Sequence, residues 1–427
     1  MAQYELLERI GKGGMAEIFR ASQTAGSGFE KIVAIKRILP HLSQDQRFIK
    51  LLIAEAKILS ELHHRNIVQI YDVGLGDDSQ YFLVMEFVDG VDLLKMYDDF
   101  TGSGRLPVEV ALHICSELCE ALEHAHIAKD DQGNPLGLVH RDVSPSNVLL
   151  SKYGEVKLTD FGIAKQVGEV TGHGAIRGKF AYISPEQAVN KHVDARSDVF
   201  SVGILLYELV CGRRLYSGYP DFDALREVRA ARVNPSAREI RRVASPLADI
   251  IMRALSKRPE DRFQSAGDFG SALRGYRYSL ETEIADPRAA IADLVVRQVV
   301  EAETTTPKDV LPDYSDDFAD DVGGTVVRIN TAQEFFSTDL SGLHQLVTEY
   351  PEPRFEDMSD ERAIAQRLAD VDDADEPTRL HQRIPVPPPR ASAPVPSAPV
   401  SAPVPSAPVS APAPFVPVSA PAPFVPV

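Results

Sequence analysis

Residues 140–162 read HRDVSPSNVLLSKYGEVKLTDFG, and this stretch indicates the fold more strongly than any other part of the chain. It places Asp142 and Asn147 five residues apart in a loop that leads into an apolar run at Val148–Leu150. A second carboxylate, Asp160, follows thirteen residues after Asn147. One carboxylate can orient a hydroxyl group, while an amide and a carboxylate can ligate a cation bound to phosphate. The spacing therefore predicts two loops that face one phosphate-binding site.

Two elements closer to the N-terminus indicate the same chemistry. A glycine-rich turn, Gly11–Gly14, joins two strand-like stretches, and its backbone amides can point at phosphate oxygens. On the next predicted strand Lys36 ends the sequence Val-Ala-Ile-Lys, and the helical stretch that begins near Asp45 offers Glu55 as its acidic partner. Taken singly, the glycines are also typical of an ordinary strand turn, and Glu55 of a solvated helix charge. The order of all the parts favours the functional interpretation.

The hydrophobic pattern divides the first 280 residues into two regions. Strand-like alternation occurs at residues 4–38, 67–73 and 81–88, with one helical stretch at 45–62. From Pro107 to Ala125 apolar residues recur every third or fourth position, which predicts a long helix. Further helices are predicted at 196–212, 221–231, 245–256 and 265–279. A β-rich region followed by a helical one predicts an α+β fold of two lobes with a cleft between them, joined near Met85–Gly90.

At this point the first 280 residues resemble the eukaryotic-like protein kinases, specifically their bacterial serine/threonine members. Ser184-Pro185-Glu186 stands where that family ends its activation segment, and Arg262 matches the arginine that pairs with this glutamate. Asp198 matches the aspartate that anchors the backbone of the His-Arg-Asp loop. The resemblance implies a bilobal protein-kinase-like fold: a small antiparallel β-sheet lobe with one helix (1–88) and a larger, mostly α-helical lobe (89–280).

The resemblance implies ATP-dependent transfer of the γ-phosphate to serine or threonine hydroxyls of proteins, with autophosphorylation through a transient homodimer and a role in bacterial signal transduction. In this interpretation Asp142 is the catalytic residue that orients the acceptor hydroxyl, and Lys36 with Glu55 fixes the phosphates. Asn147 and Asp160 hold Mg²⁺, for which Mn²⁺ is the alternative. The ATP pocket is expected to comprise Ile10, Gly11, Lys12, Gly13, Gly14, Ile18, Ala34, Lys36, Glu86, Val88 and Leu149, with Met85 as gatekeeper. An apolar spine is expected from Leu59, Ile70, His140 and Phe161.

Two positions depart from the family pattern. Ser144 stands where the family carries a lysine that reaches the γ-phosphate, and Lys179 stands where it carries a threonine of the substrate-binding segment. We interpret this as a compensated swap, with Lys179 supplying the positive charge and Ser144 the hydroxyl. The alternative is a pseudokinase scaffold that binds nucleotide and partner proteins without catalysis. The same two positions normally indicate hydroxyl preference, so serine, threonine and tyrosine all stay open. A small-molecule kinase is disfavoured by the Pro-Glu motif and its paired arginine.

The sequence also predicts a regulatory phosphorylation site. Between Gly162 and Gly178 the one hydroxyl side chain is Thr171, and the resemblance implies that Arg141 and Lys165 gather around its phosphate. The alternative is a loop threonine without a role.

The C-terminal region is acidic and low in complexity. The chain has a net charge of −17, and residues from Glu281 onward contribute 25 Asp/Glu against 10 Lys/Arg. We expect a helical extension at 281–300, an acidic disordered linker at 301–384 and a Pro/Ala/Ser/Val-rich disordered tail at 385–427. Such acidity argues against nucleic acid or anionic membrane as a partner. Apolar residues within 324–346, among them Val326, Val327 and Ile329, predict a short motif that docks a partner protein.

The cysteines and the N-terminus indicate a cytoplasmic protein. Three cysteines (Cys115, Cys119 and Cys211) are too few for a disulfide framework, and a reducing compartment is the plain interpretation. Cys115 and Cys119 are expected to be core residues of one helix face. No leader or membrane-spanning run is predicted.

Overall fold

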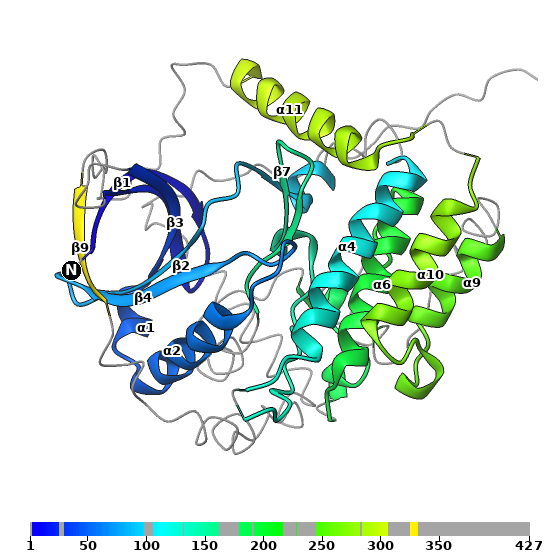
Figure 1. Cartoon of the computed structure of the whole chain (residues 1–427), viewed down its shortest axis with the longest axis horizontal. Coiled ribbons are helices and arrows are strands. Elements are labelled where there is room, and N and C mark those ends of the chain that lie inside the picture. Colours follow the sequence, from blue (N-terminus) through cyan, green and yellow to red (C-terminus); the bar gives the residue numbers. More distant parts are fainter. Residues whose placement is uncertain are drawn as a thin grey trace, which may run out of the picture. The chain divides into compact units, whose positions relative to one another are not determined.

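The computed structural model describes residues 2–24, 30–97, 106–130, 132–161, 179–189, 192–216, 228, 245–281, 284–305 and 325–331. Within these ranges the predicted fold class is confirmed: a β-sheet lobe precedes a helical lobe (Figure 1). The helix predicted at 221–231 lies outside the described residues except for Val228, which is helical. The predicted tail at 385–427 also lies outside them.

The N-terminal lobe is an antiparallel sheet with one long helix. Its strands are β1 (Ala2–Lys12), β2 (Ala16–Thr24), β3 (Glu30–Ile38), β4 (Ile70–Gly76) and β5 (Tyr81–Glu86), in the order β1-β2-β3-β5-β4. Buried side chains from these strands fill the interior, including Tyr4, Leu6, Phe19 and Phe82. Helix α2 (Gln46–Glu61) follows the short α1 (Pro40–Ser43) and packs with Phe48, Ile49 and Leu52 toward the sheet.

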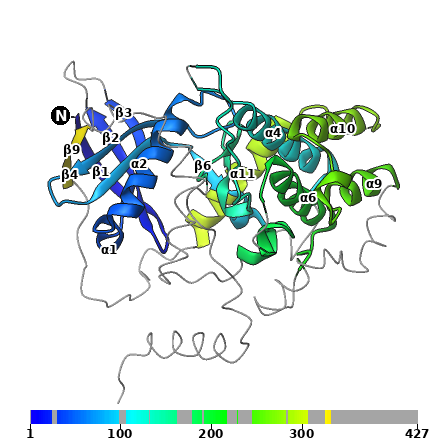
Figure 2. The same ribbon diagram turned by 90° about the horizontal axis from the view of Figure 1, so that it is seen from below.

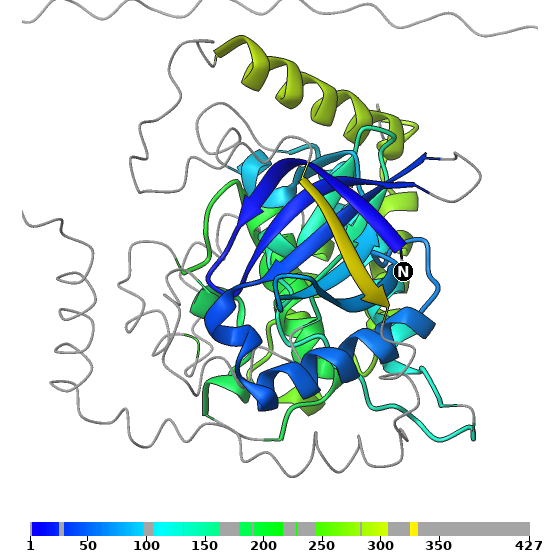
Figure 3. The ribbon, with the colours of Figure 1, turned by 90° about the vertical axis from the view of Figure 1, so that its left-hand side faces the viewer.

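A sixth strand joins this sheet from far along the chain. Strand β9 (Thr325–Thr331) pairs with β1 on one side and β4 on the other, which closes the sheet into a barrel. Figure 3 shows β9 lying across the barrel beside β1. This strand lies within the range expected to be an acidic linker, and it was not predicted as a strand.

The helical lobe is built around a helix that is buried on every side. Helix α6 (Ala195–Cys211) carries buried residues at almost every position, and it packs on α4 (Val108–His126), α9 (Ser245–Ala254) and α10 (Ala266–Tyr278). Figure 2 shows these four helices side by side. The Asp194 side chain caps the N-terminus of α6 by accepting from the Arg196 amide, and Gly212 ends it in the left-handed conformation.

The helical lobe also contains a small sheet and several 3-10 helices. A small sheet consists of β6 (Gly90–Asp92), β7 (Val148–Ser151) and β8 (Val156–Leu158). The 3-10 helices are η1 (Pro145–Asn147), η2 (Lys179–Tyr182), η3 (Gln187–Val189) and η4 (Pro259–Asp261).

The predicted helical extension is present as α11 (Pro287–Thr305). Ile291 and Val295 are fully buried and belong to the main core, because the helix packs on α4 and on the β6–β7 sheet. Near its start, Arg288 donates through Nε to the carbonyl of Tyr153, in the turn between β7 and β8 (3.0 Å). No helix of the described ranges combines the length and apolarity that crossing a bilayer requires.

Gly154 allows the close approach of α11 to the β7–β8 turn. It has φ of 76°, and a Cβ at this position would overlap the carbonyl oxygen of Arg288. Gly133 also has positive φ (83°), but nothing lies within 4 Å of its would-be Cβ. The two glycines therefore share a backbone cost and differ in packing.

We predict that Gly154→Ala destabilises the protein by more than Gly133→Ala. A left-handed residue other than glycine costs roughly 1–2 kcal/mol, which applies to both variants. The overlap with α11 adds about 1–3 kcal/mol for Gly154→Ala alone. Urea unfolding of the two variants measures the difference, and equal free energies of unfolding would contradict the close contact.

Candidate active site

The loop that carries Asp142 is held by a buried carboxylate on α6. Asp198 accepts from the backbone amides of His140 (2.8 Å) and Arg141 (2.9 Å) and lies 2.8 Å from Nε2 of His126. Burial alone would raise the pKa of Asp198, but the hydrogen bond to His126 and the neighbouring charges outweigh it and lower the pKa. An ionised carboxylate therefore fixes the loop, and Arg141 adopts φ of 65° beside it.

Asp142 and Asn147 contact each other directly. Nδ2 of Asn147 donates to the backbone carbonyl and to Oδ2 of Asp142, both at 2.7 Å. The Asn147 carbonyl in turn accepts from the amide of Thr159, next to Asp160 (3.0 Å). These bonds orient the Asp142 carboxylate and leave Oδ1 of Asn147 as the atom of this side chain that suits a metal.

An ion pair connects the two lobes at the site. Nζ of Lys36 on β3 lies 2.6 Å from Oδ1 of Asp160, which follows β8 and has φ of 58°. Glu55 on α2 is buried and lines the same cavity of about 60 Å³ as Lys36 and Asp160. The predicted Lys36–Glu55 pair stays a prediction, while Lys36 and Asp160 are brought together directly.

The residues expected to form the apolar spine lie close to this cavity. Leu59, Ile70 and Phe161 line it, and the rings of His140 and Phe161 lie 4.5 Å apart. Nε2 of His140 also lies 3.1 Å from the carbonyl of Thr159. The catalytic loop and the Asp-Phe-Gly segment are therefore joined by both ring packing and a polar contact.

The residues predicted to contact adenine flank the connection between the lobes. Ala34 is buried, and Ile18, Val88 and Leu149 are partly buried against the main core. The Glu86 amide donates to the carbonyl of Gln69 (2.8 Å), so in a backbone hydrogen bond with adenine the Glu86 carbonyl oxygen would be the acceptor. In the predicted phosphate loop, the Gly13 amide donates to the Ala16 carbonyl (2.9 Å), while Ile10 is exposed. Gly11 and Lys12 form the end of β1, and Gly14 follows in the turn before β2.

The donor set suits a divalent cation shared with phosphate. The described residues hold no group of three or more His, Cys, Asp or Glu side chains that could bind a metal by themselves. One amide oxygen (Asn147) and one carboxylate (Asp160) agree with the preference of Mg²⁺, which takes one or two protein oxygens and completes its shell with phosphates and water. The two residues therefore fit the metal that the sequence predicts.

Comparison with known proteins agrees with this geometry. Residues 4–269 match the family described as the protein kinase domain. The chain belongs to the protein kinase family. It is 37% identical over 284 residues to Tyrosine-protein kinase MasK of Myxococcus xanthus, and the match covers 64% of this chain and 43% of that protein. It is 38% identical over 274 residues to Serine/threonine-protein kinase PksC of Streptomyces coelicolor, covering 62% and 47%. The chain thus spans less than half the length of these curated relatives.

Among solved structures, the PknI kinase domain of Mycobacterium tuberculosis is 28% identical. The superposition covers 64% of this chain and 95% of that domain, with a TM-score of 0.48.

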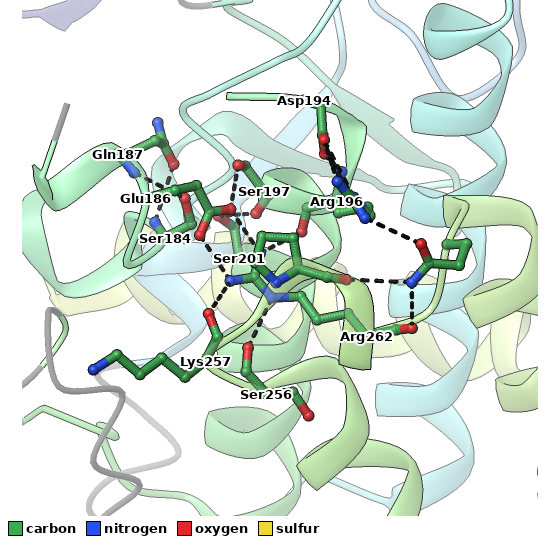
Figure 4. Close-up of polar contacts among 12 residues, drawn as sticks. Ser184, Glu186, Gln187, Asp194, Arg196, Ser197, Ser201, Ser256, Lys257 and Arg262 are labelled. Carbon is green, nitrogen blue, oxygen red and sulfur yellow. Dashed lines mark hydrogen bonds and ion pairs between the residues drawn. The ribbon is translucent and has the colours of Figure 1, made fainter. Parts of the chain in front are cut away.

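A buried ion pair holds the end of the kinase activation segment to the helical lobe (Figure 4). Arg262 donates from both terminal nitrogens to Glu186 at 2.6 and 2.7 Å, and Ser197 donates to the same carboxylate at 2.5 Å. Arg262 also donates to the backbone carbonyls of Arg196, Ser256 and Lys257. Burial alone would raise the pKa of Glu186, but these bonds outweigh it, and the pKa is lowered.

Sequence reasoning missed two polar clusters of this kinase. Lys157 on β8 is buried and pairs with the carboxylate of Glu86 at 2.8 Å, which ties the inter-lobe connection to the β7–β8 hairpin. This contact could have been suspected from the sequence, because a lysine lies inside an otherwise apolar strand and a buried charge needs a partner.

The second missed cluster lies beneath the end of the activation segment. The Tyr182 hydroxyl donates to Oε2 of Glu208 (2.7 Å), and Arg214 contacts the same hydroxyl. Glu208 is fully buried, and burial raises its pKa despite these bonds and the Leu215 amide. Glu208, a charged residue within the apolar sequence of α6, was the feature from which a buried polar cluster could have been predicted.

Several predicted residues cannot be placed. Thr171 and Lys165 lie outside the described residues, and for Lys179 only the backbone is described, at the start of η2. Ser144 is buried, and its hydroxyl lies 3.0 Å from that of Ser146.

We predict that Arg262→Ala costs about 3–5 kcal/mol of unfolding free energy at pH 7, because it leaves the buried Glu186 carboxylate unpaired. The matched control is Arg258→Ala, whose exposed side chain pairs with Glu260 and whose free energy of unfolding should equal that of the parent within the error of the measurement. Chemical denaturation measures both.

The cost of Arg262→Ala should depend on pH. The pKa of Glu186 is lowered from about 4.5 in the folded protein, so the pair stabilises above that value and its contribution is lost as the pH falls below it. The difference between parent and Arg262→Ala should therefore narrow in acid, and a constant difference would contradict an ionised Glu186.

Proposed function

We propose that this chain is an active protein kinase that transfers the γ-phosphate of ATP to serine and threonine hydroxyls of proteins. The observation that carries the proposal is the joint placement of two contacts: the Lys36–Asp160 ion pair and the Asn147–Asp142 hydrogen bonds. They present a phosphate-binding cation, two metal-binding oxygens and a carboxylate toward the junction of the lobes. Family membership gives this arrangement its substrate, ATP.

Each residue has a role that its contacts support. Lys36 would bind the α- and β-phosphates. Asp160, which it contacts, and Oδ1 of Asn147 would hold Mg²⁺, or Mn²⁺ in the same positions. A metal bound there would supply positive charge against the phosphate oxygens. Asp142, oriented by Nδ2 of Asn147, accepts a hydrogen bond from the acceptor hydroxyl and aligns its oxygen for attack.

The intact geometry favours catalysis over the pseudokinase alternative. Lys36 contacts Asp160, Asn147 contacts Asp142, and the loop that holds Asp142 is fixed by the ionised Asp198. A scaffold that only binds nucleotide would not require an oriented Asp142.

Tyrosine is the second candidate acceptor. Ser144 replaces the lysine typical of serine/threonine kinases, and one relative, MasK, carries the name of a tyrosine kinase, whereas PksC is named a serine/threonine kinase. The residue type that becomes phosphorylated decides between the two.

We further propose a cytoplasmic role in bacterial signal transduction. Cys115, Cys119 and Cys211 are buried free thiols, as a reducing compartment allows, and burial raises the pKa of Cys119 so that its thiolate is disfavoured. Phosphorylation of Thr171, with Arg141 and Lys165 around the phosphate, would order the activation segment.

We predict that the purified chain incubated with ATP and Mg²⁺ phosphorylates itself, and that Asp142→Asn lowers the rate at least about 10²-fold because the acceptor hydroxyl loses its carboxylate. Asp249→Asn, an exposed carboxylate on α9, is the matched control and should retain the parental rate. Mass spectrometry reports the rate, the residue type and the sites, with Thr171 expected among them. Phosphate on tyrosine alone would favour the second candidate, and none at all would contradict the kinase proposal.

We also predict that Lys179→Ala lowers autophosphorylation about 10²–10³-fold, because the transferring phosphoryl group loses a positive charge. The double variant Ser144→Lys with Lys179→Thr should regain part of the lost activity. Lys129→Ala removes an exposed lysine elsewhere and serves as control. Full activity of Lys179→Ala would refute the compensated swap.

A further inference from the structure

Strand β9 lies beyond the part of the chain that matches the kinase family. The match ends at residue 269, and β9 spans Thr325–Thr331. Without β9 the sheet of the N-terminal lobe has two open edges, β1 and β4, because the order of the other strands is β1-β2-β3-β5-β4. An open edge presents unpaired amides and carbonyls that can bind an extended segment.

The same few residues of β9 pair with both edge strands. Tyr4 of β1 is opposite Val327, and Gly76 of β4 is opposite Ile329. Both ladders are antiparallel, so the backbone of one short segment is paired on its two sides.

The part of β1 that pairs with β9 also belongs to the barrel interior. Along Gln3–Leu6 the side chains alternate, with Tyr4 and Leu6 buried and Gln3 and Glu5 exposed. Tyr4 and Leu6 share one cluster with Phe19 and Phe82. Pairing of β9 therefore occurs where the edge strand carries core residues, and release of β9 would loosen that edge of the core.

The amino-acid sequence of β9 is suited to this pairing and differs from its surroundings. Residues 322–333 contain no Asp or Glu, although Asp320 and Asp321 precede them and Glu334 follows. Thr325–Thr331 reads TVVRINT and is rich in β-branched residues, which favour strands. Acidic residues on either side discourage the segment from adding to other exposed strands.

Chain length allows the segment to come from the same molecule. Nineteen residues, 306–324, separate the end of α11 from β9, and a chain of that length spans at most roughly 65 Å. Covalent attachment raises the effective concentration of a segment at its site to roughly millimolar values. At micromolar protein, docking within one molecule is therefore favoured over docking between copies.

We propose that edges β1 and β4 of the N-terminal lobe form a docking site for an extended strand, and that residues 325–331 of the same chain occupy it. The docking motif predicted from the apolar residues in this region thus has the kinase's own lobe as its partner. Docking of β9 can be measured whether or not the kinase is active, because it protects backbone amides from hydrogen exchange.

The test is hydrogen exchange on the full chain, with parent, Val327→Pro and Ser337→Pro compared. Proline at position 327 removes an amide from the middle of β9 and disrupts its ladders, whereas position 337 lies beyond the strand. We expect Val327→Pro to speed exchange at Ala2–Leu6 and Gly74–Gly76 at least about tenfold, with Val33–Ile35 of the central strand β3 unchanged. Ser337→Pro should behave as the parent does. Unchanged exchange at both edges in Val327→Pro would overturn the proposal.

A peptide of residues 322–333 distinguishes loss of docking from general misfolding. Added to the Val327→Pro chain, it should restore edge protection in proportion to its concentration, even if the variant exchanges throughout the lobe. Failure to restore protection would overturn the docking site. Light scattering gives the oligomeric state, and a parent dimer that Val327→Pro converts to monomer would overturn docking within one molecule in favour of exchange between copies.

Discussion

Two consecutive residues at the start of the buried helix α6 hold the loop that carries Asp142 and the end of the activation segment. Asp198 binds the amides of His140 and Arg141, and Ser197 donates to Glu186 at the end of the activation segment. Both lie on one turn of a helix that the core surrounds, so neither can move without disturbing that packing. The lowered pKa of Asp198 has the same origin, since a buried carboxylate stays ionised only when donors surround it. The position of the loop that carries Asp142 therefore depends on a charge that burial alone would neutralise.

From this anchor the site extends across the lobes through two further ion pairs. Lys36 contacts Asp160, and Lys157 contacts Glu86, and in each pair the partners come from segments far apart in sequence. Both pairs are partly shielded from water, which strengthens their attraction relative to exposed pairs. Lys36 and Asp160 are also the groups that would bind phosphate and metal, respectively. Because their charges are opposite, the two side chains attract each other as well as these ligands. The same electrostatics that position the lobes therefore keep the binding groups near one another.

The sequence allowed the fold class to be predicted, and it allowed the proposed site residues to be assigned to loops, because the spacing within each motif is fixed. His140–Asn147 and Asp160–Gly162 are short, local patterns whose chemistry is clear from the residue types. Partners distant in sequence could not be derived in this way. The contacts of Lys157 with Glu86 and of Tyr182 with Glu208 depend on packing of separate elements, and a periodic pattern does not encode them. A local signal for strand β9 was visible in the sequence, because the segment lacks acidic residues. That β9 pairs with β1 and β4 could be learned only from the structure, in which the sheet is closed.

The folded unit of this kinase is larger than the region that carries its motifs. Ile291 and Val295 of α11 belong to the same core as α4 and α6, and Gly154 lacks a side chain where α11 approaches the β7–β8 turn. That turn lies in the hairpin between the catalytic loop and Asp160, so α11 supports the site from outside the matched region. Strand β9 does the same for the sheet whose strand β1 continues toward the predicted phosphate loop. The boundary of the folded unit is thus set by which residues are buried, not by where the motifs end. Residues after 280 contribute to both lobes, α11 by packing on the core of the helical lobe and β9 by pairing with the sheet of the N-terminal lobe.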